Sequence, residues 1–549
     1  MSFRLLEQAI LGKSRPAAME VSELQSSGWI SPFAAALAIC AVLTAASLLV
    51  PPFIDNDSGN GFLAWRGTLQ GEFNSIIEPE HANIDKDGVV FLTWFSPGQY
   101  MVPGAISLLG VPLGVAMTLT VGLSLLLSLI GWIAVVRTFA PRRGLALPVV
   151  VLISLFHYST HAFSTYHGGE ILQQAVTPWL ILAAYRVPQT GAVAAALLAA
   201  GVVFLGFFAK LTGLMLALAA LAASGLVFLA SGRRFTRSLI SGAFGAMAAL
   251  VLYLGFLSRG WTAASATSWS LPPDNIVFSL LAPWVAGISW PDPMYLIFSK
   301  YYYLPAVHIA LLLPPAVLAM ALVLFWRPQT TKEQEFRTFS LWFSGILAIV
   351  FILLFIYGAA ISPEERHFRS AGTLLFVCAM MAVAGTGISR WMRGVFLTLC
   401  VVMALFGLAS FSYHQLTTAK GPWLYQKSWT NLRIFDPAAV DFLQEAYARE
   451  GRNALFVFPS YELALTLPTE ARVLAMDFNL WAKISEVRDL RYAGRVPGHV
   501  FVLLPNTIID AQSGTSDASK GRALLSSFTD YAADAWKRKS FQNTSVFFQ

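Results

Sequence analysis

Two carboxylates stand directly after the first long apolar stretch of the sequence, where the chain would leave a membrane. The stretch covers residues 30–50, and Asp55 and Asp57 follow shortly after it. At the boundary between water and lipid, loss of solvent can raise the pKa of a carboxyl group and make it an effective general base. The alternative is a helix cap, a position that Asp favours. The aromatic and turn-rich segment that follows favours a packed, functional role for the pair.

A second polar group lies between two later apolar stretches and consists of His157, His161, His167 and Glu170. Three imidazoles and a carboxylate near one membrane surface could ligate a transition metal. However, His157 and His161 are four residues apart without a carboxylate between them, so the spacing matches no standard zinc pattern. The favoured interpretation is a glutamate in a polar substrate cleft, and no protein-bound metal site is predicted.

Lys210 is a single cation between two strongly apolar segments. A lysine left at the centre of a bilayer costs about 2.5–3.5 kcal/mol on insertion scales. The turn expected at this position places Lys210 near the membrane interface instead. There it could extend its ammonium group toward water, or it could bind a lipid phosphate.

A late loop contains three basic residues, Arg366, His367 and Arg369, for which there are again a functional and a structural interpretation. The guanidinium of arginine matches the oxygens of a phosphate in a bidentate geometry. The alternative is that the arginines pair with the neighbouring Glu364 and Glu365.

The elements that must position these residues are membrane-spanning helices. Of 549 residues, 56% are hydrophobic and 12% are charged, against about 25% charged in an ordinary soluble domain. Apolar runs of this length cross a hydrocarbon core of about 30 Å as helices. We predict about eleven spans: 30–50, 113–136, 145–163, 171–185, 191–209, 212–231, 237–257, 304–326, 338–358, 371–388 and 394–413.

The distribution of basic residues predicts one orientation. With a cytoplasmic N-terminus, the inner segments carry groups such as Arg137, Arg142 and Arg143, whereas the longer outer segments carry fewer Lys and Arg. Such a bias toward the cytoplasm sets the topology of membrane proteins. It also explains the net charge of +7 without a nucleic-acid partner. All the candidate site residues then fall on the outer side.

The chain divides into three parts. Residues 1–28 are expected to be a cytoplasmic N-terminal segment, and residues 29–413 a transmembrane domain with large outer loops at 51–102 and 258–303. Residues 414–549 return to a soluble composition and alternate strand-like and helical runs, which predicts a small extracytoplasmic α/β domain. No glycine-rich phosphate loop follows its strands.

Taken together, these features resemble the GT-C class of membrane glycosyltransferases, such as the protein O-mannosyltransferases and the aminoarabinose transferases of lipid A. The first likeness is an acidic pair after the first span, with a glycine about fourteen residues later. The second is an acidic residue that opens a helix after the second outer loop. The third and fourth are a Leu-(Thr/Ser)-Lys-x-x-Gly stretch and a late Glu-Arg-Tyr stretch. The matching residues are Asp55, Asp57 and Gly71; Glu170; Phe208 to Gly213 around Lys210; and Glu365-Arg366-His367. The chain departs from the pattern in Asp-Asn-Asp for Asp-Glu, in Ala209 before the lysine and in His367 for tyrosine.

The resemblance implies transfer of a sugar from a polyprenyl-phosphate donor to a glycan, lipid or protein acceptor, with inversion. Asp57 would be the general base, supported by Asp55 and Glu170 as catalytic residues. The resemblance places Lys210, Arg366, His367, Arg369 and His167 in substrate binding. No cofactor is certain, although some relatives require a divalent cation such as Mg²⁺ or Mn²⁺. The implied location is the bacterial inner membrane, with the site and the C-terminal domain on the periplasmic side and membrane lipid as a further partner.

Three other functions remain open. A secondary transporter would place charged groups near the bilayer midplane, whereas the predicted spans are nearly free of charge. An O-antigen polymerase or ligase would also have many spans and large outer loops. A non-catalytic relative could act as an assembly subunit.

Overall fold

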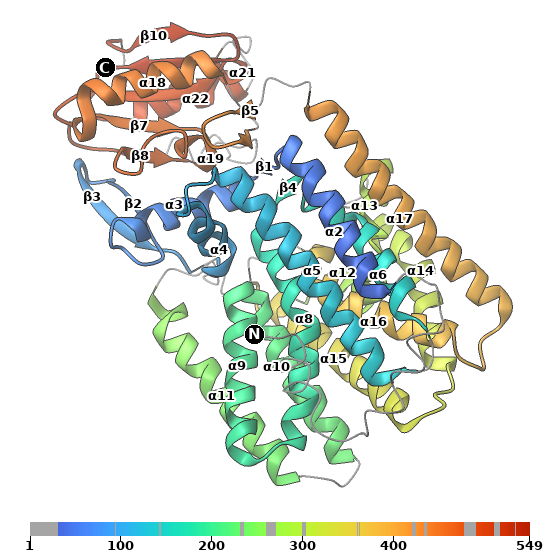
Figure 1. The fold of residues 1–549 in the computed structure, drawn as a ribbon. Coiled ribbons are helices and arrows are strands. Elements are labelled where there is room, and N and C mark those ends of the chain that lie inside the picture. The colour runs from blue at the N-terminus through green and yellow to red at the C-terminus, as the bar shows by residue number, and fades with distance from the viewer. Residues whose placement is uncertain are drawn as a thin grey trace.

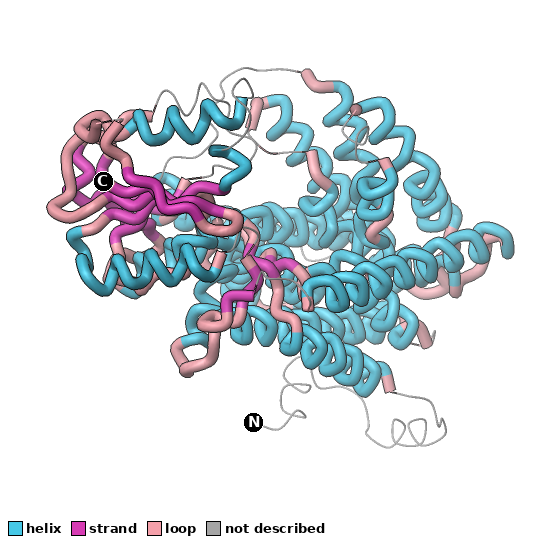
Figure 2. Tube along the Cα trace, turned by 90° about the horizontal axis from the view of Figure 1, so that it is seen from above, coloured by secondary structure: helices cyan, strands magenta, loops and turns pink. Residues whose placement is uncertain are grey.

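The structure is a computed structural model that describes residues 31–549, apart from 94, 142–143, 231–234, 260–270, 299–303, 360, 362, 420–423, 433–435, 477–489, 510–515 and 533. The predicted cytoplasmic segment, residues 1–28, lies outside the described residues, as does part of the predicted loop 258–303. The described chain forms a bundle of helices with strands gathered at one side of it (Figures 1 and 2).

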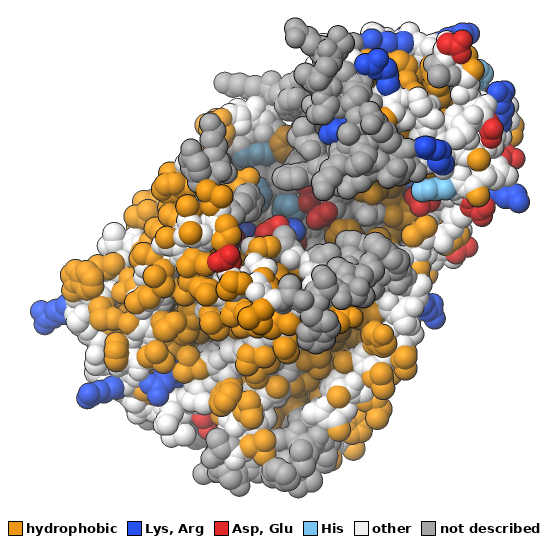
Figure 3. All heavy atoms as spheres, turned by 180° about the vertical axis from the view of Figure 1, so that it is seen from behind, with side chains coloured by type: hydrophobic (Ala, Val, Ile, Leu, Met, Phe, Trp, Pro, Cys, Tyr) orange, Lys and Arg blue, Asp and Glu red, His pale blue; other side chains and the backbone are white. Residues whose placement is uncertain are grey.

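The prediction of a multi-spanning α-helical membrane protein is confirmed. Within the described residues, eight helices are long and apolar enough to cross a membrane, judged by length and composition. They are α2 (Pro32–Leu49), α5 (Leu113–Phe139), α9 (Ala192–Ala209), α10 (Leu211–Ala230), α11 (Phe235–Gly255), α14 (Pro305–Phe325), α15 (Thr331–Ile356) and α17 (Arg390–Thr418). Exposed apolar side chains cover much of the surface of the bundle (Figure 3), which suits contact with lipid.

The count of eleven spans is not confirmed. The other three predicted ranges contain α6 (Ala146–Leu155) with the short α7 (His157–His161), α8 (Gly168–Arg186) and α16 (Arg369–Val383). Helices α6 and α16 are shorter than the eight, and α8 is long enough but not among the helices apolar enough to cross a membrane. Every residue of α16 from Ser370 to Val383 is buried. Because other helices surround it, the composition of α16 is not set by contact with lipid.

A small sheet joins segments that are far apart in the sequence. Its order is β4 (Thr165–Tyr166), β1 (Phe53–Ile54), β6 (Thr430–Asn431) and β5 (Leu424–Tyr425). The short strand β1 runs parallel to both β4 and β6. We call the end of the bundle that carries this sheet the sheet end. The sheet fixes the starts of two helices, α3 (Asn56–Leu69) after β1 and α8 after β4.

The two predicted outer loops are more regular than expected. Residues 51–102 contain α3, a hairpin of β2 (Ser75–Glu80) and β3 (Asn83–Phe91), and the start of α4 (Gly98–Ser107). Residues 258–303 were expected to be an outer loop, and much of the described part of this range is helical. It contains α12 (Pro273–Val285) and α13 (Pro291–Ile297), and α12 packs against α14, α15 and α16. The apolar face of α12, including Phe278 and Val285, is buried there, so this segment belongs to the bundle.

The predicted C-terminal α/β region is present. Helix α18 (Pro437–Glu450) and strands β7 (Leu455–Phe458) and β9 (Val500–Pro505) lie where the sequence predicts them. The five-stranded sheet has the order β10 (Lys537–Ser540), β11 (Thr544–Phe548), β9, β7 and β8 (Arg472–Ala475). A further helix of this region is α22 (Ser516–Ser527). Helix α17 also runs beyond the predicted boundary at 413, to Thr418.

Candidate functional site

The parallel strands β1 and β4 bring Asp55 and His167 together. Each residue directly follows its strand, and the carboxyl ends of neighbouring parallel strands lie at the same edge of a sheet. Oδ2 of Asp55 lies 2.7 Å from Nδ1 of His167. Asp55 also caps α3, because its Oδ1 accepts a hydrogen bond from the backbone N–H of Ser58 at 2.9 Å. The capping interpretation is therefore correct for Asp55.

The ion pair shifts both pKa values. Burial alone would raise the pKa of Asp55, but the charge and hydrogen bond of His167 lower it below its ordinary value. Burial would lower the pKa of His167, and Asp55 raises it instead. Asp55 is thus engaged in holding His167 and the start of α3.

Asp57 is placed differently, although it lies only two residues further on. It sits in the first turn of α3, and its side chain is 54% exposed. Burial of its carboxyl group and repulsion from Asp55 raise its pKa above the ordinary value, although Arg366 opposes this. A carboxylate with a raised pKa that is open to a ligand has the properties of a general base.

Glu170 and Lys210 form the central ion pair. Glu170 lies in the first turn of α8, and Lys210 is the single residue between α9 and α10. The Lys210 ammonium donates a hydrogen bond to Oε1 of Glu170 at 2.6 Å. A Cβ atom at Gly169 would lie 3.2 Å from Cγ of Lys210 and 2.9 Å from Oε1 of Gln99. Glycine at this position therefore lets the lysine side chain lie along the first turn of α8.

The ion pair between Glu170 and Lys210 also influences the pKa values of both groups. Burial alone would raise the pKa of Glu170, but Lys210, His167 and Arg366 hold it well below its usual range. Burial lowers the pKa of Lys210, and Glu170 opposes the change.

Arg366 connects the acidic groups of the site. It lies in a short 3₁₀ turn, η5 (Glu365–Phe368), just before α16. Its guanidinium is 2.5 Å from Glu364, 3.8 Å from Glu170 and 3.9 Å from Asp57. Arg366 therefore pairs with its neighbour Glu364, as the alternative interpretation expects, and it also faces the site; its binding of a phosphate stays a prediction.

His367, the next residue, contributes a neutral group. Its two ring nitrogens are buried and have no hydrogen-bond partner among the residues that the structure describes. Burial and the charges of Lys210 and Arg366 lower its pKa to about 3. A neutral imidazole can donate one hydrogen bond and accept another.

Arg369 lies apart from this group and interacts with a residue that the sequence did not indicate. Its Nη2 is 3.4 Å from Oδ1 of Asp292, and Oδ2 of the same carboxylate is 3.2 Å from Nδ1 of His157. Burial would raise the pKa of Asp292, but His157 and Arg369 lower it to about 2. The available signal was an acidic residue between two prolines, Pro291 and Pro293, in an aromatic segment.

Two cavities meet at a wall formed by His167, Glu170 and Arg366. The first, the Asp57 cavity, has a volume of about 410 Å³. Its polar lining includes seven of the eight predicted site residues: Asp55, Asp57, His167, Glu170, Lys210, Arg366 and His367. Its apolar lining includes Leu211, Met215, Leu354 and Ile361.

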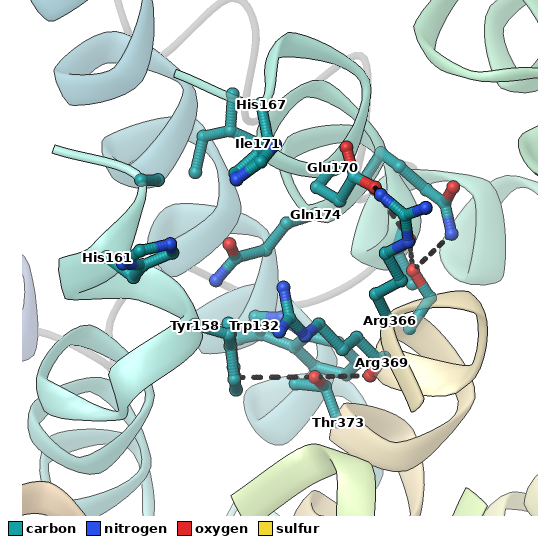
Figure 4. A pocket seen from close by; sticks show the side chains of 14 residues that line it. Trp132, Tyr158, His161, His167, Glu170, Ile171, Gln174, Arg366, Arg369 and Thr373 are labelled. Carbon is teal, nitrogen blue, oxygen red and sulfur yellow. Dashed lines mark hydrogen bonds and ion pairs between the residues drawn. The ribbon is translucent and has the colours of Figure 1, made fainter. Parts of the chain in front are cut away.

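The second, the Asp292 cavity, has a volume of about 530 Å³. It contains Arg369, the remaining predicted residue, together with His157, His161, Asp292 and His414. A smaller pocket of about 30 Å³ lies against the same wall, and Figure 4 shows Glu170 and Arg366 pointing toward each other in it. The four predicted outer segments thus contribute to one place at the sheet end. Their roles in catalysis and binding stay predictions.

The site offers little to a divalent cation. No group of three or more His, Cys, Asp or Glu side chains suited to holding a metal occurs within the described part of the chain. Asp55 is paired with His167 and Glu170 with Lys210, so two of the three predicted catalytic carboxylates already have a cationic partner. These residues fit an anion-binding site better than a metal site.

Comparisons with known proteins give similarities of structure. No family model and no curated protein matches the chain. Among solved structures, ArnT from Cupriavidus metallidurans bound to undecaprenyl phosphate is 11% identical, over 94% of this chain and 97% of that one, with a TM-score of 0.47. The same protein in the apo state gives 11% identity, the same coverage and a TM-score of 0.45. The arabinofuranosyltransferase AftD from Mycobacteria is 13% identical over 94% of this chain and 40% of its own, with a TM-score of 0.47.

Proposed function

We propose that the chain is a glycosyltransferase that moves a sugar from a polyprenyl-phosphate donor to an acceptor at the outer face of the bacterial inner membrane. The observation that carries this proposal is the composition of the Asp57 cavity. It places two cations, Lys210 and Arg366, in the same space as a carboxylate with a raised pKa, Asp57. These are the groups needed to bind a phosphate and to accept a proton close to it.

The lining of the Asp57 cavity suits both the phosphate and the beginning of the prenyl chain of such a donor. Arginine and lysine form charge-assisted hydrogen bonds to phosphate oxygens. The apolar side chains on α10 and α15, among them Met215 and Leu354, suit the beginning of a prenyl chain.

The reaction that follows is an inverting displacement. Asp57 takes the proton from a hydroxyl or amine of the acceptor, and the oxygen or nitrogen forms a bond to the anomeric carbon of the sugar. The bond from that carbon to the phosphate oxygen breaks on the opposite face, and polyprenyl phosphate leaves. Lys210 and Arg366 stabilise the charge that grows on the phosphate, a contribution that is often the largest in catalysis.

The Asp292 cavity suits the acceptor. It shares the wall of His167, Glu170 and Arg366 with the Asp57 cavity, so a molecule bound there would lie beside the donor. Its side chains, including Asp292 and Arg369, can bind hydroxyl, amine or phosphate groups. The acceptor would be a glycan, a lipid or a protein.

A transporter is less well supported, because α2, α9, α10 and α14 contain no Asp, Glu, Lys or Arg, and the charged residues of α5, α15 and α17 lie near the helix ends. The charged groups lie at the sheet end instead, and His and charged side chains are visible in a hollow there (Figure 3). The surplus of basic residues in the predicted inner segments supports placing the sheet end on the periplasmic side.

The proposal is tested by transfer with purified protein, radiolabelled undecaprenyl-phosphate sugars and membrane extract as the source of acceptor. We expect Asp57→Asn to lower the rate by about 10²- to 10⁴-fold, as for loss of a general base. The matched control is Asp441→Asn, which alters an exposed carboxylate on α18 and should transfer at the wild-type rate. Equal transfer by wild type and Asp57→Asn would exclude Asp57 as the base. Absence of transfer from any lipid-linked sugar would favour a transporter or an assembly subunit.

A further inference from the structure

One oxygen atom of Glu170 faces both cations of the Asp57 cavity. Oε1 accepts the hydrogen bond from Nζ of Lys210 at 2.6 Å and lies 3.8 Å from Nη1 of Arg366. Among the described residues, Glu170 is the only acidic side chain that lies within ion-pair distance of Lys210. The carboxylate therefore occupies the position from which one phosphate oxygen could contact both cations.

A lipid phosphate and Glu170 would compete for this position. Both are anions with oxygens that accept hydrogen bonds, and Lys210 and Arg366 both line the cavity. Two anions that share one pair of cations repel each other strongly in a partly enclosed site. Binding of the phosphate to Lys210 and Arg366 thus requires Glu170 to release at least one of them.

The structure offers Glu170 a second place to go. The same side chain lines the Asp292 cavity and the small pocket beside it, where Arg369 also lies (Figure 4). Arg369 is paired with Asp292 at 3.4 Å through one nitrogen, and a guanidinium has further donors. A carboxylate released from Lys210 would therefore face a cation, or an acceptor, in the Asp292 cavity.

We propose that Glu170 is a positioning residue that stands in for the donor phosphate and is released toward the Asp292 cavity when the donor binds. The inference rests on the proposed function, which assigns the donor to the Asp57 cavity. The inference also predicts an order of binding. The donor phosphate binds first and frees the carboxylate of Glu170, which then orients the acceptor. A ligand can shift a side chain in this way because it interacts differently with the two positions.

The test is equilibrium binding of undecaprenyl phosphate to the full chain in lipid nanodiscs. We expect Glu170→Gln to bind about 5- to 20-fold more tightly than wild type, a coupling of ordinary size, because the internal competitor has lost its charge. Glu364→Gln is the matched control, since it removes a carboxylate 2.5 Å from Arg366 but none that the structure pairs with Lys210. It should tighten binding less than Glu170→Gln does, because Glu364 competes with the phosphate for Arg366 alone. Lys210→Gln should bind more weakly than wild type.

Each outcome separates the two proposals. If Lys210→Gln weakens binding but Glu170→Gln does not tighten it, the inference about Glu170 is overturned and the donor site stands. Equal tightening by Glu364→Gln and Glu170→Gln would also overturn it, because a general change in charge would then explain the effect. If neither Lys210→Gln nor Arg366→Gln weakens binding, the donor site itself is wrong. A cryo-electron microscopy structure with undecaprenyl phosphate provides a second measurement. In it, Nζ of Lys210 should lie beyond hydrogen-bond distance of Oε1 of Glu170, and an unbroken contact would contradict the inference.

Discussion

Arg66 on α3 and Arg366 in η5 each hold a positive charge in an enclosed part of the protein, but their partners differ. Arg66 is 7% exposed and donates four hydrogen bonds of 2.5–2.9 Å to backbone carbonyls of the C-terminal region. Arg366 is more exposed and has three carboxylates around it, those of Glu364, Glu170 and Asp57. The first cation is held by carbonyl groups of the main chain, whereas the second is balanced by carboxylate side chains beside a cavity.

The difference indicates two uses of buried charge. The carbonyls around Arg66 belong to Ala464, Pro468, Thr469 and Ala471, and none of them can leave without moving the chain. Arg66 therefore joins the helix that carries Asp57 to the C-terminal region. The close approach of α3 to α19 (Tyr461–Ala464) supports this, because a Cβ atom at Gly59 would lie 2.6 Å from the backbone nitrogen of Glu462. Around Arg366 an incoming anion can replace a carboxylate, so this cation can serve binding.

The largest expected effect is on stability at Arg66. Arg66→Met removes all four hydrogen bonds of a charged donor, and a hydrogen bond to a charged group is worth about 1.5–3 kcal/mol. We expect a loss of about 4 kcal/mol in the free energy of unfolding, seen as a large fall in the melting temperature measured by tryptophan fluorescence. Arg452→Met is the control, since its side chain is 59% exposed and its surface ion pair should contribute at most about 1 kcal/mol. A melting temperature equal to wild type in Arg66→Met would show that the two cations do not differ as described.

A smaller effect, on the affinity for the donor and not on stability, is expected at Arg366. Arg366→Met removes a charge that hydrogen-bonds a phosphate in the proposed complex, a contact worth about 1.5–3 kcal/mol. The affinity for undecaprenyl phosphate should fall by about 10- to 100-fold, measured by the binding assay used for Glu170. The melting temperature should change much less than in Arg66→Met, because no buried carbonyl loses a donor. Loss of stability without loss of affinity would place Arg366 with Arg66, among the cations that only support the fold.

Much of the site could be predicted because its signals are local in the sequence. Apolar runs and the bias of basic residues place Asp57, Glu170, Lys210 and Arg366 on one side of the membrane, and residues on one side can meet. The pairing of Lys210 with Glu170 could not be predicted, since it depends on how α8 meets the break between α9 and α10. Asp292 was missed for a similar reason.

Prediction of the fold has the same limit, because contacts between distant segments do not show in the local sequence. The segment that contains α12 and α13 is rich in proline and aromatic residues, which indicated a loop, but tertiary packing makes it part of the bundle. Helices α8 and α16 look like spans in the sequence, yet neighbours enclose them, so periodicity and hydropathy do not show whether they touch lipid. Likewise, nothing near Arg66 in the sequence indicates its carbonyl partners, which lie about 400 residues away.

The two regions should also respond differently to pH. Asp57 must be ionised to accept a proton, and its pKa is raised. Transfer at saturating donor should therefore fall as the pH falls through that pKa, by about tenfold for each pH unit below it. The charge of Arg366 lowers the pKa of Asp57, so in Arg366→Met this fall should begin at a higher pH than in wild type. Arg66 contacts neutral carbonyls, and a milder variant, Arg66→Lys, should leave the pH at which the fall begins unchanged. The pH at which transfer begins to fall is measured from rates of transfer across a pH series, with the rates of each variant scaled to its own maximum. A shift to lower pH in Arg366→Met, or an equal shift in both variants, would mean that Arg366 does not set the ionisation of the base.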